Sequence, residues 1–139
     1  MLSLLQLHEE VCRFANVLKG IGIPRGDRVA ISLFMCAELA IALLACARIG
    51  AIHSVIFGGF AAHAISDRVN DSACVAVLTQ DTSYRRGTEV KLKAIVDEAL
   101  EKCPTVRNVV VYRRSGSPVS MKEGRDIWWD EAMLAAEKE

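Results

Sequence analysis

Residues Arg28 to Phe34 read RVAISLF, a short apolar run that is rich in branched side chains and follows a Gly-Asp turn. Three more runs of this kind occur along the chain, at residues 52–57, 74–79 and 108–112. They are continuous rather than alternating in polarity, and such runs are typical of parallel strands that are covered on both faces. The pattern therefore predicts a parallel sheet of about four strands.

The segments between these runs are long enough to cross back over the sheet. A crossover between parallel strands needs about a dozen residues and usually contains a helix. Helical patterns occupy these segments at residues 36–49, 60–70 and 89–102. The expected fold class is α/β, a three-layer α/β/α arrangement that forms a Rossmann-like subdomain.

Helices are also expected at the two ends of the chain. Ser3 and Gln6 match a capping box, and the amphipathic pattern that follows them breaks near Gly20. Residues 113–125 contain several Gly, Ser and Pro residues and predict an exposed loop. A last helix is expected to begin at a capping aspartate and to carry a pair of tryptophans, namely Asp126, Trp128 and Trp129.

The chain of 139 residues has the length and composition of one globular domain. Its 17 Lys and Arg residues balance its 17 Asp and Glu residues, which argues against a nucleic-acid or anionic-membrane binder that relies on bulk charge. No run of about 18 apolar residues suits a membrane span, and the N-terminus lacks the basic start of a signal peptide. A cytoplasmic protein without a nucleic-acid or membrane partner is expected.

The cysteines do not form a metal-binding or redox motif. They are widely spaced, and no Cys-x-x-Cys pair occurs. The three histidines show no metal-ligand spacing either. We therefore expect no metal site, and we expect reduced thiols within the core. The cysteines are Cys12, Cys36, Cys46, Cys74 and Cys103.

The predicted helix at residues 36–49 is apolar on nearly every side, with charge only at Glu38 and Arg48. Such a helix needs cover from all directions, which a chain of this length can hardly provide. The sequence therefore predicts one incomplete domain, residues 1–139, with an apolar face for the rest of a larger fold or for a second copy of itself. The alternative is a small domain with a very apolar central helix.

Ligands of open α/β sheets bind beyond the carboxyl ends of the strands. Gly58 and Gly59 follow the second predicted strand and open a helix, where a ligand can approach the backbone and helix-start amides attract anions. The pair lacks the three-glycine spacing of a dinucleotide site. A tight turn without a ligand is the alternative.

The second candidate site follows the third predicted strand, in DTSYRRGT at residues 81–88. It places Arg85 and Arg86 beside Gly87 in a predicted loop. Guanidinium groups offer planar, bidentate donors to phosphate, which makes this loop a candidate phosphate site. The alternative is a solvated basic loop.

No catalytic centre is evident in the sequence. It contains neither a Gly-x-x-x-x-Gly-Lys-[Ser/Thr] loop nor a Gly-x-Ser-x-Gly elbow. The carboxylate pairs, Asp97-Glu98 among them, lie within predicted helices, where solvated faces are expected. We therefore predict ligand-binding residues but no catalytic residue.

The stretch CARIGAIHSVIFGGF at residues 46–60 closely resembles a signature of AMP-forming acetyl-coenzyme A synthetases, which belong to the adenylate-forming superfamily. The likeness continues through residues 67–71 and 92–100 and ends with EGRDIWW at 123–129. The resemblance implies an acetate–coenzyme A ligase. Such enzymes convert acetate and ATP to acetyl-adenylate and pyrophosphate, use magnesium, and then pass the acetyl group to coenzyme A.

The same resemblance implies that the chain is a piece of the family's large N-terminal domain. The family's phosphate loop follows shortly after the Trp-Trp stretch, and the chain ends before it, at Glu139. The ribose-binding acidic residue, the adenylation lysine and the acetate pocket are also expected elsewhere. We therefore expect the chain alone to be inactive, with the rest of the enzyme as its partner. A relative that acts on propionate, and a non-catalytic α/β module that binds a nucleotide-like phosphate or a protein, are the alternatives.

Carried over by position, the family's coenzyme A site falls on the two candidate loops. Arg85 matches the first arginine of an Arg-x-x-Arg-like segment that contacts the 3′-phosphate of coenzyme A, and the adenine lies near the Gly-Gly turn. The second arginine is replaced by Thr88, which can donate only one hydroxyl hydrogen bond. Arg86 is a candidate substitute, and weak binding is expected. The expected coenzyme A-binding residues are Gly58, Gly59, Arg85, Arg86, Gly87 and Thr88.

Overall fold

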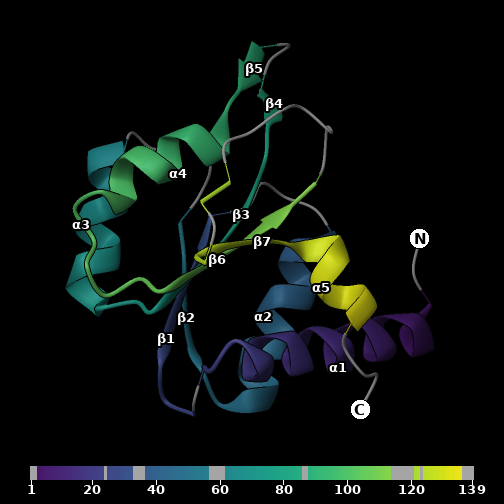
Figure 1. Ribbon diagram of the computed structural model, residues 1–139. Helices are drawn as coiled ribbons and strands as arrows, with labels where there is room; N and C mark the ends of the chain where they lie inside the picture. The colour runs from purple at the N-terminus through teal and green to yellow at the C-terminus, as the bar shows by residue number, and fades with distance from the viewer. Residues whose placement is uncertain are drawn as a thin grey trace.

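The computed structural model describes residues 3–23, 25–32, 37–56, 62–85, 88–113, 121–122 and 124–135. These residues form a parallel sheet between two layers of helices, as the sequence predicts (Figure 1). A separate two-stranded sheet follows the carboxyl end of a central strand.

The main sheet has five strands in the order β2-β1-β3-β6-β7, and every neighbouring pair is parallel. Four of these strands confirm the four predicted apolar runs, with small differences at their ends. The strands are β1 (Arg28–Ser32), β2 (Ile52–Val55), β3 (Ala76–Gln80), β6 (Asn108–Tyr112) and β7 (Asp126–Trp128).

The sequence prediction is wrong for the fifth strand. Asp126 and Trp128 are expected in a helix, yet both lie in β7, and the last helix begins only at Trp129. Val109 lies opposite Asp126 in the register of β6 and β7, and Val111 lies opposite Trp128. A three-residue strand is too short to show its period in the sequence. Pairing with β6 satisfies its backbone groups, and only the tertiary fold supplies that partner.

The helices divide between the two faces of the sheet. The first, second and last helices share one hydrophobic core with one face, and the other two share a second core with the opposite face (Figure 1). Successive strand residues point to opposite faces, so Val110 packs in the first core and Val109 and Val111 in the second. The helices are α1 (Leu4–Gly20), α2 (Ala37–Ile49), α3 (Ala62–Ser72), α4 (Leu92–Leu100) and α5 (Trp129–Ala135).

The predicted capping box at the start of α1 is confirmed. The backbone N–H of Gln6 donates to Ser3 Oγ at 3.1 Å, and the Ser3 N–H donates to Gln6 Oε1 at 2.9 Å. Each contact satisfies an amide that the first helical turn would otherwise leave unpaired. The helix ends at Gly20, near the predicted break, and Gly22 adopts a φ of +88° in the turn that follows.

Four of the cysteines lie where the sequence places them, inside the core. Cys12, Cys46, Cys74 and Cys103 are buried and free, while Cys36 lies outside the described residues. Burial raises the pKa of the Cys46 thiol to about 12, because a thiolate is poorly solvated in an apolar environment. These thiols act as small apolar side chains.

Several large apolar side chains remain on the surface. Leu4 is 87% exposed, and Leu5 and Leu44 are also exposed. Leu4 and Leu44 help to line a groove between α1 and α2, with a volume of about 300 Å³. Exposed apolar side chains are therefore present on both α1 and α2. Among the described helices, none is both long and apolar enough to cross a bilayer.

Candidate functional site

The carboxyl edge of the parallel sheet carries buried polar side chains. Ser32 at the end of β1 lies opposite Thr79 of β3 in the parallel register, and both side chains are completely buried. Neither hydroxyl has a hydrogen-bond partner among the residues that the structure describes, which is uncommon for buried polar groups. This edge thus retains hydrogen-bonding capacity at the place where open α/β sheets bind ligands.

The predicted Gly58-Gly59 turn lies outside the described residues, as do Arg86 and Gly87. Its neighbours are described. Ile56 is buried after β2, with its N–H donating to the Ile31 carbonyl at 2.7 Å, and α3 begins at Ala62.

Residues 83–85 and 88–90 form the two strands of a hairpin, where the sequence predicts a loop at residues 81–88. Strand β4 (Ser83–Arg85) pairs antiparallel with β5 (Thr88–Val90), and Arg85 lies directly opposite Thr88. Because β5 continues to Val90, α4 starts at Leu92 rather than at residue 89. Tyr84 and Val90 favour strands, but each strand also needs the other as its antiparallel partner. The hairpin brings together the two positions of the expected Arg-x-x-Arg-like segment.

The residues that flank this hairpin form its stem, with Asp81 and Thr82 before β4 and Lys93 after β5. They are buried and hydrogen-bonded. Asp81 donates its backbone N–H to the Tyr112 carbonyl at 3.1 Å, and its carbonyl accepts the N–H of Lys93 at 3.2 Å. The Asp81 carboxylate accepts the N–H of Thr82 at 2.7 Å, and the Gln80 side-chain amide donates to the Thr82 carbonyl at 3.1 Å. Both ends of the hairpin are thereby attached to the sheet and to α4.

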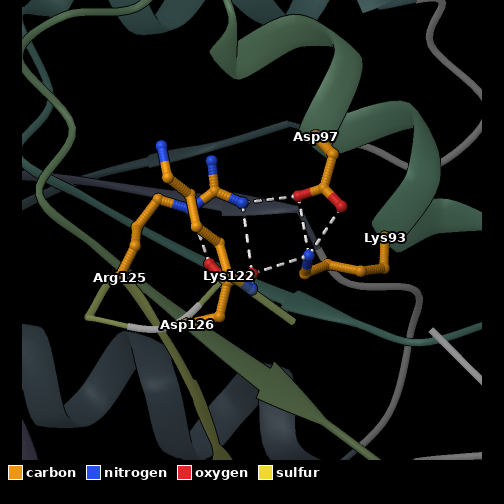
Figure 2. A network of polar contacts seen from close by, with 5 residues as sticks. All are labelled: Lys93, Asp97, Lys122, Arg125 and Asp126. Carbon is orange, nitrogen blue, oxygen red and sulfur yellow. Dashed lines mark hydrogen bonds and ion pairs between the residues drawn. The ribbon is translucent and has the colours of Figure 1, made fainter. Parts of the chain in front are cut away.

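A network of four charged side chains lies beside this stem (Figure 2). Lys93 Nζ of α4 lies 2.6 Å from Asp97 Oδ1 and 2.9 Å from Asp126 Oδ2. Arg125 Nη2 lies 2.7 Å from Asp97 Oδ1, and Arg125 Nε lies 2.6 Å from Asp126 Oδ1. The backbone N–H of Lys122 donates to Asp126 Oδ2 at 2.8 Å. Two cations and two carboxylates therefore balance within one cluster.

The surroundings of Asp126 and Arg125 shift their pKa values. Burial alone would raise the pKa of Asp126, but hydrogen bonds from Arg125, the Lys122 amide and Lys93 outweigh it, so the pKa lies below its ordinary value. The hydrogen bond to Asp126 raises the pKa of Arg125 against the opposing effect of its own burial. The pair is therefore ionised at neutral pH.

This network was not predicted from the sequence. Asp97 is expected on a solvated helix face, yet its side chain is 29% exposed and forms ion pairs with Lys93 and Arg125. The spacing of Lys93 and Asp97, four residues apart on a helix, is a recognisable ion-pair signal. The contacts to Arg125 and Asp126 join segments about thirty residues apart and have no local signal.

Comparison with known proteins decides the family. A profile of the family described as AMP-binding enzyme matches residues 1–138. The chain belongs to this family.

Relatives from this family match the chain over most of its length. Acetyl-coenzyme A synthetase of Alkalilimnicola ehrlichii is 54% identical over 127 residues, which are 91% of this chain and 20% of that protein. The protein of the same name from Rubrobacter xylanophilus is 54% identical over 134 residues, 96% of this chain and 21% of that protein. A solved acetoacetyl-CoA synthetase from Streptomyces lividans matches with a TM-score of 0.84 at 27% identity, over 94% of this chain and 20% of that chain. The chain thus spans about a fifth of the length of these relatives.

The chain also has a groove between α3 and α4 with a volume of about 610 Å³. His63 and Ser66 line it from α3, and Glu98 and Lys102 line it from α4. In the part of the chain that the structure describes, no group of three or more His, Cys, Asp or Glu side chains could hold a metal ion.

Proposed function

We propose that this chain forms part of the large N-terminal domain of a cytoplasmic, AMP-forming acetate–coenzyme A ligase. The observation that carries the proposal is the identity of 54% to two acetyl-coenzyme A synthetases over 91% and 96% of the chain. In the proposed reaction, an acetate oxygen attacks the α-phosphorus of ATP and pyrophosphate leaves. The coenzyme A sulfur then attacks the acetyl carbonyl of acetyl-adenylate, and AMP leaves.

The contribution of this chain to that reaction is a coenzyme A subsite on the β4–β5 hairpin. Arg85 offers a guanidinium to the 3′-phosphate, with Thr88 opposite it in the ladder. Arg86 and Gly87 connect these two positions, and Gly58 and Gly59 follow the neighbouring carboxyl edge. The carboxyl-edge position of the stem supports this assignment, because ligands of open α/β sheets bind there.

The adenylation chemistry is assigned to the four-fifths of the relatives that this chain does not span. The chain alone is therefore inactive, and the rest of the enzyme is its partner. The exposed leucines of α1 and α2, Leu4, Leu5 and Leu44, support such a partner, because apolar surface of this kind is usually covered. Self-association through the same face is the competing arrangement.

A chimera tests the proposed function. The matching segment of the Alkalilimnicola ehrlichii synthetase is replaced by this chain, and two rates are measured: acetate-dependent exchange of pyrophosphate with ATP, and formation of acetyl-coenzyme A. Both are expected to persist. Propionate is assayed alongside acetate. A folded chimera that has lost the exchange reaction would favour a non-catalytic module instead.

The coenzyme A subsite is tested in the same chimera with Arg85→Ala. Loss of a charge-assisted hydrogen bond should raise the KM for coenzyme A about ten- to a hundredfold, with the exchange reaction unchanged. Arg107→Ala is the matched control, because Arg107 is an exposed arginine that precedes β6, at the amino edge of the sheet. Equal effects of the two substitutions on the KM would remove Arg85 from the subsite.

A further inference from the structure

The side chain of Lys93 is charged and yet only 1% exposed. Burying an ammonium group is costly unless charged partners satisfy it, and an apolar side chain of similar size would often stabilise the fold equally well. Lys93 is satisfied by two carboxylates, Asp97 on its own helix and Asp126 on β7 (Figure 2). The burial of this charge therefore calls for an explanation beyond the packing of the core.

Lys93 connects three separate parts of the fold. The backbone N–H of Lys93, which follows β5, donates to the carbonyl of Asp81, which precedes β4. This hydrogen bond joins the two ends of the β4–β5 hairpin. The side chain of Lys93 joins α4 to the first residue of β7. Arg125 also belongs to this network, because it forms ion pairs with Asp97 and Asp126, the same two carboxylates that bind Lys93.

The hairpin depends on its stem for its orientation. Strands β4 and β5 form a sheet of their own, separate from the five-stranded sheet, and they project beyond it at the start of α4 (Figure 1). An isolated two-stranded hairpin is marginally stable in water. Its direction relative to the sheet is therefore set at the stem, where Asp81 and Lys93 are hydrogen-bonded.

We infer that Lys93 is a positioning residue for the coenzyme A subsite: its buried ion pairs with Asp97 and Asp126 hold the stem of the β4–β5 hairpin and so fix the placement of Arg85 and Thr88. This inference rests on the proposed function for the identity of the ligand. The placement of the hairpin itself does not depend on any ligand. Lys93 touches neither substrate nor cofactor in this role.

Amide hydrogen exchange in the full 139-residue chain tests the placement. Lys93→Met removes the charge and keeps most of the side-chain length. It should speed exchange of the β4 and β5 amides about tenfold or more, since a charge-assisted contact is lost, while the amides of β1 and β3 are unchanged. Lys122→Met is the matched control, because Lys122 joins the network through its backbone N–H. Uniform acceleration across the sheet, or none in the hairpin, would overturn the inference.

Two further variants keep the test decisive if Lys93→Met fails to fold. Asp97→Asn removes one partner that is partly exposed, and it should produce the same localised acceleration to a smaller extent. Lys93→Arg keeps the charge and should restore slow exchange in the hairpin. An Asp97→Asn chain with wild-type exchange in β4 and β5 would contradict the role assigned to the network.

Titration with coenzyme A and 3′-dephospho-coenzyme A, followed by amide shifts, tests the link to the subsite. The wild-type chain should bind coenzyme A more tightly, and Lys93→Met should lose that preference while Lys93→Arg retains it. If no chain distinguishes the two ligands, the proposed subsite fails, but the exchange experiment still decides whether Lys93 positions the hairpin. If Lys93→Met shows faster amide exchange in the hairpin and still binds coenzyme A more tightly than 3′-dephospho-coenzyme A, then Lys93 has no role in ligand binding.

Discussion

Phe14 of α1 and Trp129 of α5 stack face to face, with ring centroids 3.8 Å apart and planes inclined by 14°. Tyr112 of β6 meets Trp129 edge-on at 6.0 Å. Phe14 and Trp129 are both buried in the core shared by α1, α2 and α5. The contact therefore joins the last helix to the first.

Trp129→Ala is expected to lower the free energy of unfolding by about 3–5 kcal/mol, because it empties a large buried site and removes the stacking contact. Urea denaturation measures the change. Leu134→Ala is the control on the same helix, since Leu134 is 85% exposed, and it should change stability by less than about 0.5 kcal/mol. Similar losses from both variants would show that α5 is not anchored through Trp129.

The buried network predicts a dependence of stability on pH. The pKa of Asp126 is lower in the folded chain than its ordinary value near 3.8. A lowered pKa contributes stability above the unfolded-state pKa, and this contribution is lost as the pH falls through the folded-state pKa. Asp126→Asn should therefore lower the free energy of unfolding by about 3–5 kcal/mol at pH 7. The difference in this free energy between the variant and the wild type should become smaller below about pH 4.

Urea denaturation between pH 7 and pH 3 measures this difference. Asp71→Asn removes an exposed carboxylate from α3 and serves as the control, with no comparable gap at either pH. A gap between wild type and Asp126→Asn that stays constant over the whole range would mean that the network does not depend on ionised Asp126.

The buried thiols predict slow alkylation. With its pKa raised to about 12 by burial, Cys46 should be almost entirely protonated at pH 8, and the thiolate is the reactive species. Iodoacetamide should therefore label Cys46 about a hundredfold more slowly in the native chain than in concentrated urea, as followed by mass spectrometry of the labelled peptides. Native labelling of Cys46 at the rate seen in urea would show that the site is open to solvent.

The chain alone should release no pyrophosphate from ATP when acetate is added. The physical reason is that phosphoryl-transfer chemistry depends on several charged groups that are positioned together, and the chain spans only about a fifth of the length of the synthetases that it resembles. A coupled pyrophosphatase assay measures the release, with the Alkalilimnicola ehrlichii synthetase as the positive control. Turnover by a contaminant-free sample would contradict the assignment of adenylation to the rest of the enzyme.

Binding of coenzyme A to the chain alone should be weak, on a millimolar scale, because Thr88 lacks the charge of the arginine expected there and supplies at most one hydroxyl donor. Amide shifts on titration should concentrate at residues 57–60 and 85–88. They should be smaller with 3′-dephospho-coenzyme A, and smaller in Arg85→Ala. Equal responses to the two ligands, or none at residues 57–60, would mean that these residues do not form a coenzyme A site in this chain.

The elements that the sequence predicted well are those whose signal is local. The apolar runs of β1, β3 and β6 are recognisable because a buried parallel strand is apolar on both faces. The start of α1 is recognisable because Ser3 and Gln6 are separated by the spacing of a capping box.

The elements that the sequence missed depend on partners far along the chain. Strand β7 exists because Asp126 to Trp128 pair with the open edge of β6. The hairpin likewise needs the antiparallel pairing of β4 with β5, in which Arg85 lies opposite Thr88. Asp97 looked like a surface residue because its contact with Arg125 spans 28 positions. Short segments carry too few residues for a period, so pairing decides their structure.

The amino-acid sequence by itself determined the parallel α/β architecture, the burial of the four described thiols and the family resemblance, because each of these follows from residue type and spacing within one segment. Only the tertiary structure decided that Lys93 is buried against Asp126, that Phe14 covers Trp129, and that Arg85 faces Thr88. The physical reason is that the free energy of a buried charge or a paired strand depends on the partner that folding brings to it, and residue type alone does not name that partner.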